Sequence, residues 1–203
     1  MAATRVTHVA SPLEEGSVII CTVTSSGNAA AAWVQQVCST YRLCEHDVFA
    51  GLDVEWRPSY GRARNPAALL QLCVQNRCLV FQLLHADYIP QALADSLVDP
   101  RWSFVGVGVD ADAVRLGNDY GLQVANTVDL RGLAAGQLRM PELRQAGLVR
   151  LAHAVTGVNI EKPQRVRMSA WDAYRLSDEQ IHYACIDALV SFQAGLILFN
   201  GGS

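Results

Sequence analysis

Short runs of apolar and β-branched residues alternate with stretches of helical periodicity along most of this chain. Apolar runs bounded by turn-forming residues are typical of buried strands. The pattern predicts strands over Val18–Thr24, Val48–Trp56, Trp102–Val109 and Asn126–Leu130. Two further runs, Ala67–Gln75 and Cys78–Leu84, are separated by Asn76-Arg77, which indicates a hairpin. We therefore expect the sheet to contain three neighbouring antiparallel strands, formed by the run at Val48 and this hairpin.

Helical spacing of apolar residues recurs between these runs. It predicts helices over Asn28–Cys44, Ile89–Val98, Ala111–Tyr120, Pro141–Val155 and about Asp178–Phe199. The last helix follows Ser177-Asp-Glu-Gln180, which has the form of a capping box. Loops are expected at Arg57–Asn65 and, rich in basic residues, at Asn159–Trp171. Hairpin strands followed by alternating helices and strands predict an α/β fold with a mixed sheet flanked by helices.

The chain has 203 residues, which suits one domain with a full core. We expect that single domain to span 1–203, with its core at about 48–200 and an N-terminal strand and helix at about 18–44. Hydrophobic residues make up 51% of the sequence, yet no unbroken apolar run is as long as a membrane span requires. Residues 1–17 carry charges and a proline and lack the apolar centre of a secretory signal. These features predict neither a membrane span nor secretion.

Six cysteines show neither a CxxC pair nor the spacing of a zinc site: Cys21, Cys38, Cys44, Cys73, Cys78 and Cys185. In so apolar a chain they are interpreted as reduced, buried thiols of an intracellular protein of the nucleus or cytoplasm. The net charge of −3 counts against a large basic surface for nucleic acid. A narrow groove that binds cations stays compatible with this charge, because the cations offset the local negative charge.

Acidic residues in three distant windows carry the strongest chemical signal. Asp53 and Glu55 are two apart on a predicted strand and therefore share one face. Asp112 opens a predicted helix, and Asp187 lies one helical turn after Tyr183. Carboxylates are costly to bury unless a positive partner joins them, and hard divalent cations prefer oxygen ligands. Each window alone fits an ordinary half-exposed strand or core helix equally well. Together they indicate a site for two cations, the usual machinery for cutting a phosphodiester.

These windows resemble the motifs of the DEDD superfamily of 3′→5′ exonucleases, and within it the tyrosine-type, Werner-syndrome-like branch with its stand-alone plant members. The matched segments are Asp-Val-Glu-Trp at 53–56, Gly-Val-Gly-Val-Asp-Ala-Asp at 106–112 and Tyr-Ala-Cys-Ile-Asp at 183–187. The resemblance covers roughly Val48–Phe192 and implies an RNase-H-like fold and two Mg²⁺ or Mn²⁺ ions. It further implies that Asp53, Glu55 and Asp187 hold one ion, that Asp53 and Asp112 hold the other, and that Tyr183 positions the attacking water. The implied products are nucleoside 5′-monophosphates.

Two motif positions have competitors. A histidine branch of the superfamily places its histidine where His182 lies, five residues before Asp187. Helical geometry favours Tyr183. A residue four positions before Asp187 points in nearly the same direction from the helix axis, whereas a residue five positions before it is rotated by about 140°. Asp110 competes with Asp112 in the second motif. The motif alignment selects Asp112, and Asp110 is then expected to cap the helix.

Substrate contacts are predicted from side chains close to the motifs. Lys162, Arg165 and Arg167 precede the third motif and could bind phosphates, although solvated loop charge is the better interpretation for any single one. Leu52 or Trp56 could wedge or stack against a terminal base. Trp56 could equally belong to the core.

The leading hypothesis is a metal-dependent 3′→5′ exonuclease acting on single-stranded or 3′-recessed DNA or RNA. A non-catalytic nucleic-acid-binding or scaffold protein is the alternative from another class, and an endonuclease of the same fold is a third. The resemblance also raises a small-RNA pathway, a homo-oligomer, and a helicase or silencing-complex protein as a separate partner chain. No residue pattern selects among these.

Overall fold

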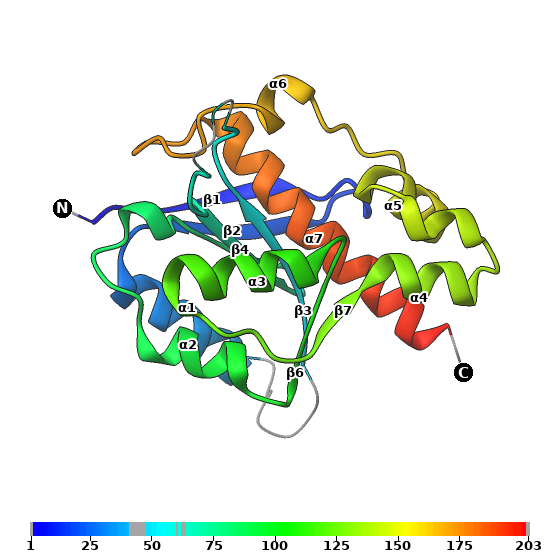
Figure 1. Cartoon of the computed structure of the whole chain (residues 1–203), viewed down its shortest axis with the longest axis horizontal. Coiled ribbons are helices and arrows are strands. Elements are labelled where there is room, and N and C mark those ends of the chain that lie inside the picture. The colour runs from blue at the N-terminus through cyan, green and yellow to red at the C-terminus, as the bar shows by residue number, and fades with distance from the viewer. Residues whose placement is uncertain (1, 41–47, 60, 62–63, 202–203) are drawn as a thin grey trace.

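A computed structural model describes residues 2–40, 48–59, 61 and 64–201, and it has one mixed sheet of seven strands with helices on both faces (Figure 1). The strands are β1 (Thr4–Ala10), β2 (Val18–Thr24), β3 (Val48–Glu55), β4 (Leu69–Val74), β5 (Arg77–Phe81), β6 (Trp102–Gly106) and β7 (Thr127–Asp129). The α-helices are α1 (Gly27–Thr40), α2 (Gln91–Val98), α3 (Val109–Tyr120), α4 (Leu130–Gln137), α5 (Leu148–Thr156), α6 (Gln164–Arg167) and α7 (Asp178–Asn200). Short 3₁₀ helices occupy Leu83–His85 and Pro141–Gln145.

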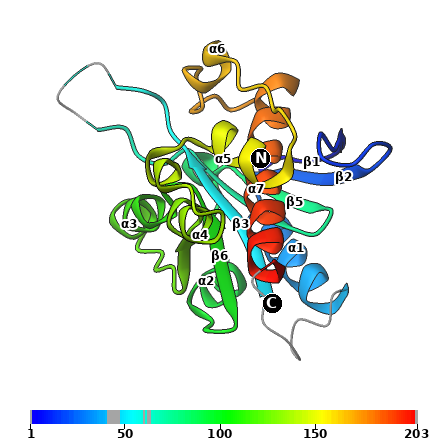
Figure 2. The same cartoon turned by 90° about the vertical axis from the view of Figure 1, so that its right-hand side faces the viewer.

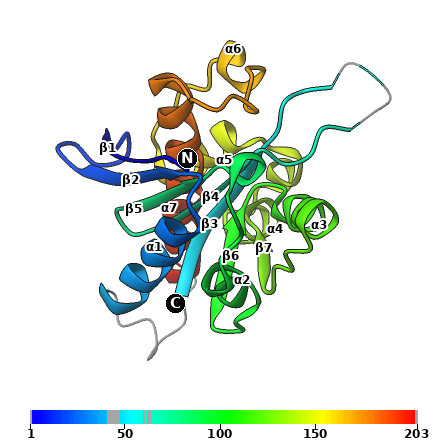
Figure 3. The same ribbon diagram turned by 90° about the vertical axis from the view of Figure 1, so that its left-hand side faces the viewer.

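The strand order is β1-β2-β5-β4-β3-β6-β7. Strands β3, β4 and β5 are antiparallel neighbours, which confirms the predicted three-stranded unit. Strands β6 and β7 extend the sheet in parallel beyond β3, and β1 and β2 extend it beyond β5 (Figures 2 and 3). The hairpin turn lies one residue earlier than predicted, because Gln75 takes a left-handed backbone conformation at φ 54° and Arg77 begins β5.

Alternation along β3 separates two cores. Leu52 and Val54 face the core that α1, α2 and α3 cover, whereas Phe49 packs against the core on the α7 side. Helices α4, α5 and α7 share this second face of the sheet. By length and composition α7 could cross a membrane, but 78% of its most apolar window is buried in the fold. Its apolar character therefore follows from its place in the core.

Helix α7 begins as predicted and then lies unusually close to the sheet. The Ser177 hydroxyl oxygen accepts a hydrogen bond from the Gln180 backbone N–H, and the Gln180 side-chain oxygen accepts one from the Ser177 backbone N–H. The predicted capping box is therefore confirmed. A Cβ placed on Gly51 would lie 1.9 Å from the Ala188 carbonyl oxygen and 2.7 Å from the Phe192 nitrogen. Only glycine permits this contact between β3 and α7, which fixes the height of the helix above the strand.

Several local predictions were wrong. Strand β1 was not predicted, and neither was α4, although Asp129 gives that helix a side-chain N-cap. The predicted helix Pro141–Val155 is divided into the 3₁₀ helix and α5, because the backbone is extended at Ala146 and Gly147. The basic segment 159–171 contains α6, and the predicted end of the first helix at Cys44 falls outside the described residues.

The cysteines do not all behave as predicted. Cys73 and Cys78 face each other across the β4–β5 hairpin and form a disulfide, so the expectation of reduced thiols is wrong for this pair. Cys21 and Cys185 are buried free thiols, as expected. Cys38 is half-buried.

Replacing Gly51 with alanine should destabilise the fold by about 3 kcal/mol or more, because the new methyl group would overlap backbone atoms of α7 that cannot move independently. Urea unfolding monitored by circular dichroism would measure the change. Gly132 in α4 is the matched control, since a Cβ there meets nothing within 4 Å. Gly132→Ala should leave stability unchanged or raise it by up to about 1 kcal/mol. Equal unfolding midpoints for the two variants would contradict the close-approach argument.

Candidate active site

The carboxyl end of β3 supplies two of the predicted acidic residues. Asp53 and Glu55 are half-buried and lie on the α7 side of the sheet, as the spacing of two predicted. Asp187 of α7 is buried, and its carboxylate lies above this strand end. One oxygen from each of these three residues lies within 4.8 Å of the others, although Asp53 and Asp187 are 134 positions apart in sequence. The spatial prediction for these three acids is thus confirmed.

Asp112 approaches the group from the other side, in the first turn of α3. It is 8% exposed and lines the same cavity as Asp53, Glu55 and Tyr183, with a volume of about 390 Å³. Its competitor Asp110 is exposed and accepts a hydrogen bond from the Thr127 hydroxyl at 2.5 Å. The helix N-cap is Gly108, without a side-chain cap, so the expectation that Asp110 caps α3 was wrong. The structure nevertheless places Asp112 at the cavity, as the motif alignment selected.

Lys162 places a positive charge beside these acids. Its Nζ lies 2.5 Å from Asp187 Oδ2 and 4.7 Å from the centre of the Tyr183 ring. Burial lowers the pKa of Lys162, but the charges of Asp187 and Asp53 act in the opposite direction. The pKa of Lys162 therefore lies above its usual value, and the ammonium keeps its charge. Asp187 Oδ2 accepts no well-formed hydrogen bond from the described residues. One ammonium therefore faces several carboxyl groups and compensates only part of their charge.

Burial dominates the protonation of these carboxyl groups. It raises the pKa of Asp187 to about 8 against the opposing effect of Lys162, and it raises that of Asp112 to about 8 with help from the Asp53 charge. The pKa of Glu55 lies well above its usual range because of burial and then the charges of Asp53 and Asp187. Burial also raises the pKa of Asp53, although Lys162 lowers it. The acids thus repel one another unless protons or cations neutralise them.

This donor set fits divalent metal ions. The carboxylate oxygens of three residues converge, and the cavity beside them is partly sheltered. Mg²⁺ and Mn²⁺ are hard ions that bind such oxygens. Asp53, Glu55 and Asp187 are the residues that would hold an ion between them, and Asp112 lies where it would assist a second.

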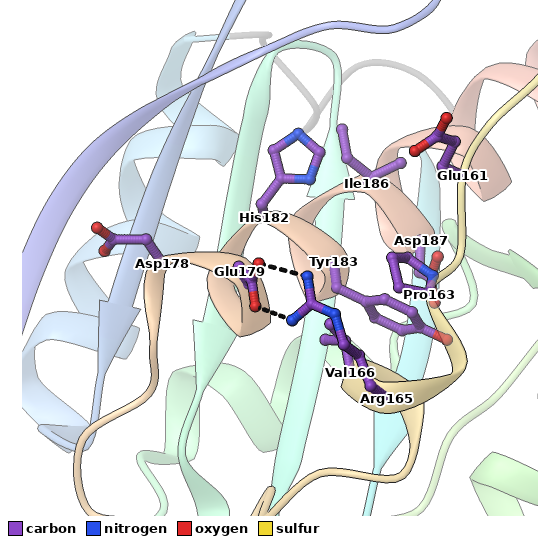
Figure 4. Close-up of a pocket in the computed structure, with 10 residues that line it drawn as sticks. All are labelled: Glu161, Pro163, Arg165, Val166, Asp178, Glu179, His182, Tyr183, Ile186 and Asp187. Carbon is purple, nitrogen blue, oxygen red and sulfur yellow. Dashed lines mark hydrogen bonds and ion pairs between the residues drawn. The ribbon is translucent and has the colours of Figure 1, made fainter.

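Tyr183 lies beside Asp187 on α7, one turn earlier, as the spacing predicted. Its ring packs against Trp171 at 5.6 Å and lines the acidic cavity. Burial and then the Asp187 charge raise the pKa of its phenol above the usual value, so the group stays neutral. His182 is exposed and lies at the wall of a neighbouring pocket of about 490 Å³ between α6 and α7, which Tyr183 and Asp187 also line (Figure 4).

The predicted substrate residues are divided among different places. Trp56, Lys162 and Arg167 line the acidic cavity. Arg165 instead lines the neighbouring pocket, where its guanidinium pairs with both oxygens of Glu179 (Figure 4). Leu52 is 1% exposed and packs in the core on the opposite face of β3, so its side chain does not line the cavity.

Arg115 is a site residue that the sequence did not reveal. Its guanidinium lies 3.8 Å from the centre of the Trp56 ring and donates to the Asn65 backbone oxygen. Its charge lowers the pKa of Asp112, against the larger effect of burial. Arg115 and Asp112 are three apart on α3, so helical spacing alone could have placed both on one face.

Comparisons with known proteins agree with this geometry. A family model described as 3′-5′ exonuclease matches residues 31–199. A 3′-5′ exonuclease of Arabidopsis thaliana is 36% identical over 153 residues, which are 74% of this chain and 52% of that protein. The bifunctional 3′-5′ exonuclease/ATP-dependent helicase WRN of Mus musculus is 32% identical over 162 residues, which are 78% of this chain and 11% of that protein.

Among solved structures, the EXO domain of Aedes aegypti Nibbler is similar in fold, with a TM-score of 0.72 at 17% identity over 88% of this chain and 86% of that one. Escherichia coli RNase D has a TM-score of 0.71 at 18% identity, over 89% of this chain and 45% of that one. The fold is therefore RNase H-like, as expected. The chain spans about half, or less, of the length of the curated relatives first matched.

Without metal, the free energy of unfolding should fall as the pH rises from about 5 to about 8. Asp112 and Asp187 have a pKa of about 8 in the folded chain and about 3.9 when unfolded. The folded chain therefore holds protons that the unfolded chain has released, and their removal destabilises only the folded state. Urea unfolding in a chelating buffer would measure this slope.

Asp112→Asn should flatten the slope, because the amide does not ionise. Millimolar Mn²⁺ should restore stability at pH 8 in the wild type by replacing the lost protons. A metal-free stability that rises over this pH range would contradict the buried, mutually repelling acids.

Proposed function

The chain belongs to the 3′-5′ exonuclease family, and from that premise we propose that it hydrolyses nucleic acid from the 3′ end with two divalent cations, Mg²⁺ or Mn²⁺. The convergence of Asp53, Glu55 and Asp187 within 4.8 Å, with Asp112 across the same cavity, carries this proposal. The bound cations would supply a low-pKa water and stabilise the attacking and leaving oxygens. The released products are nucleoside 5′-monophosphates.

Three other side chains have distinct tasks in this mechanism. The neutral Tyr183 phenol beside Asp187 orients the attacking water through a hydrogen bond. Lys162 keeps its ammonium charge and contributes to phosphate binding when cations take over the neutralisation of Asp187. Arg167 lies at the cavity and is the second candidate for a phosphate contact.

Trp56 is the candidate for contact with the terminal base. It lines the cavity and its ring is held under the Arg115 guanidinium, so its position is fixed before substrate binds. Base stacking on an aromatic ring tolerates any sequence, which suits an enzyme that removes every nucleotide in turn. We propose that single-stranded or 3′-recessed DNA or RNA is the substrate. The small cavity and the net charge of −3 favour a single strand end over a broad duplex surface.

The cellular setting is likewise a proposal. A helicase or a silencing-complex protein acting as a separate chain, assembly into a homo-oligomer, and a location in the nucleus or cytoplasm are all proposed by resemblance. The WRN relative combines exonuclease and helicase in one chain by its name, and this chain matches 11% of it.

Matched 5′-labelled DNA and RNA oligonucleotides of one sequence should be shortened from the 3′ end by wild-type protein with Mn²⁺ or Mg²⁺, and the faster substrate identifies the preferred sugar. Asp53→Ala should lower the rate by more than about 100-fold. Loss of a residue that only orients a metal ligand already costs about 10–100-fold, and Asp53 would bind the ion directly. Denaturing gels resolve the ladder of products.

The control is a circular single strand, which offers no end and should survive intact. Its cleavage would favour the endonuclease hypothesis. Absence of any product from either labelled strand, with metal present, would favour the non-catalytic scaffold.

Tyr183→Phe should lower the turnover rate by about 100-fold while leaving the fold intact, because only the hydroxyl that orients water is lost. His182→Ala, one residue away and exposed in the neighbouring pocket, is the matched control and should change the rate by less than about threefold. Single-turnover digestion of a saturating oligonucleotide compares the two. The opposite ranking would assign this chain to the histidine branch.

A further inference from the structure

Gln71 in the middle of β4 is fully buried, and neither its amide nitrogen nor its amide oxygen has a hydrogen-bond partner among the described residues. Buried amides are almost always hydrogen-bonded, because desolvation without a partner costs free energy. The other residues of β4 are apolar, as Leu-Leu-Gln-Leu-Cys-Val shows. Nothing in the packing of this strand explains a polar side chain at that position.

The register places Gln71 directly beside the acidic site. It is the cross-strand partner of Asp53, and such partners project from the same face of the sheet at neighbouring positions. Leu69 and Cys73, two residues to either side, belong to the core cluster beneath α7, whereas Leu70 and Leu72 belong to the opposite cluster. The unpaired amide therefore lies under α7 and next to Asp53.

Gln82 shows what a buried glutamine looks like when it only supports the fold. It is 5% exposed, and its Nε2 donates to the backbone oxygens of Ala173 and Tyr174. Its hydrogen bonds tie the end of the hairpin to the segment before α7. Gln71 has no such structural bonds, so a different state of the molecule must be sought to explain its amide.

Carboxylates that bind metals are usually held in place by hydrogen bonds from neighbouring donors. Asp53 lies opposite Gln71 on the neighbouring strand, and its carboxylate belongs to the acidic cluster with Glu55 and Asp187. A carboxylate that binds a cation can only accept hydrogen bonds, so a neighbouring donor can orient it. The Gln71 amide on the neighbouring strand is a neutral donor of this kind, and its nitrogen has no partner among the described residues.

We propose that Gln71 is a positioning residue of the metal site, whose amide donates to Asp53 and orients it once cations are bound. This inference rests on the proposed function, since it concerns the same site. It assigns a role to a side chain that contacts neither substrate nor the reacting atoms. Its signature is a pair of opposite effects: removal of the amide should stabilise the metal-free protein and weaken metal binding.

Gln71→Leu tests this signature, with Gln71→Met as a second variant of different shape. Urea unfolding in a chelating buffer should give a midpoint at or above that of the wild type, because an unpaired amide is replaced by an apolar side chain. Mn²⁺ titration followed by electron paramagnetic resonance of the free ion should show about 10–100-fold weaker binding. Gln82→Leu is the matched control, which should be less stable than the wild type and bind Mn²⁺ with unchanged affinity.

The outcomes separate the two proposals. If the wild-type protein binds no Mn²⁺, both the proposed function and this inference fail. If the wild type binds Mn²⁺ and Gln71→Leu and Gln71→Met bind it equally well, only this inference fails, and Gln71 is a core residue. Loss of metal-free stability or failure to fold in both variants would also overturn the inference, because the amide would then have a partner in the metal-free state.

Discussion

The contact between β3 and α7 determines the rest of this site. Gly51 lets the backbone of α7 approach the strand so closely that a single methyl group would overlap it. At this separation Asp187 reaches the carboxylates at the carboxyl end of β3, and Tyr183 comes with it one turn earlier. A core of larger side chains between strand and helix would hold these groups apart. The chemistry of the site thus depends on a packing distance set by a residue that carries no chemistry.

The close packing of α7 on β3 also brings acidic side chains together, so that their charges repel one another. Burial raises the pKa of every one of the four acids, and Lys162 supplies one positive charge beside them. The metal-free chain resolves the repulsion with protons and this ammonium, and the donor set fits cations that would replace the protons. Stability and metal binding are therefore linked through the same groups. The same buried acids thus lower the stability of the metal-free protein and favour metal binding.

The neighbouring pocket differs from the acidic cavity in character. Arg165 is occupied by Glu179 there, and Asp178 and Glu161 add negative charge to the rim (Figure 4). Tyr183 belongs to the walls of both cavities, whereas Asp187 lines the neighbouring pocket. Lys162, Arg167 and Trp56, which suit the end of a nucleic-acid strand, line the acidic cavity instead. This asymmetry favours entry of a nucleic-acid end from the side of Trp56 and Arg167.

Local sequence signals determined much of the outcome. The spacing of two on β3 and of four on α7 fixed which face each acid occupies, and the capping box fixed where α7 begins, because these are short-range geometric rules. Some wrong predictions also had a local cause. The predicted helix from Pro141 is interrupted because the backbone is extended at Ala146 and Gly147, and the spacing of apolar residues does not indicate this interruption.

Only the tertiary structure decided the remaining features, because each depends on a neighbour distant in sequence. It paired Lys162 with Asp187, and it placed Arg165 against Glu179 in the pocket beside the acidic cavity. It also left Gln71 buried without a partner beside Asp53. The sequence by itself determined which groups could do the chemistry. Their distances, burial and charge followed from how closely α7 packs on the sheet.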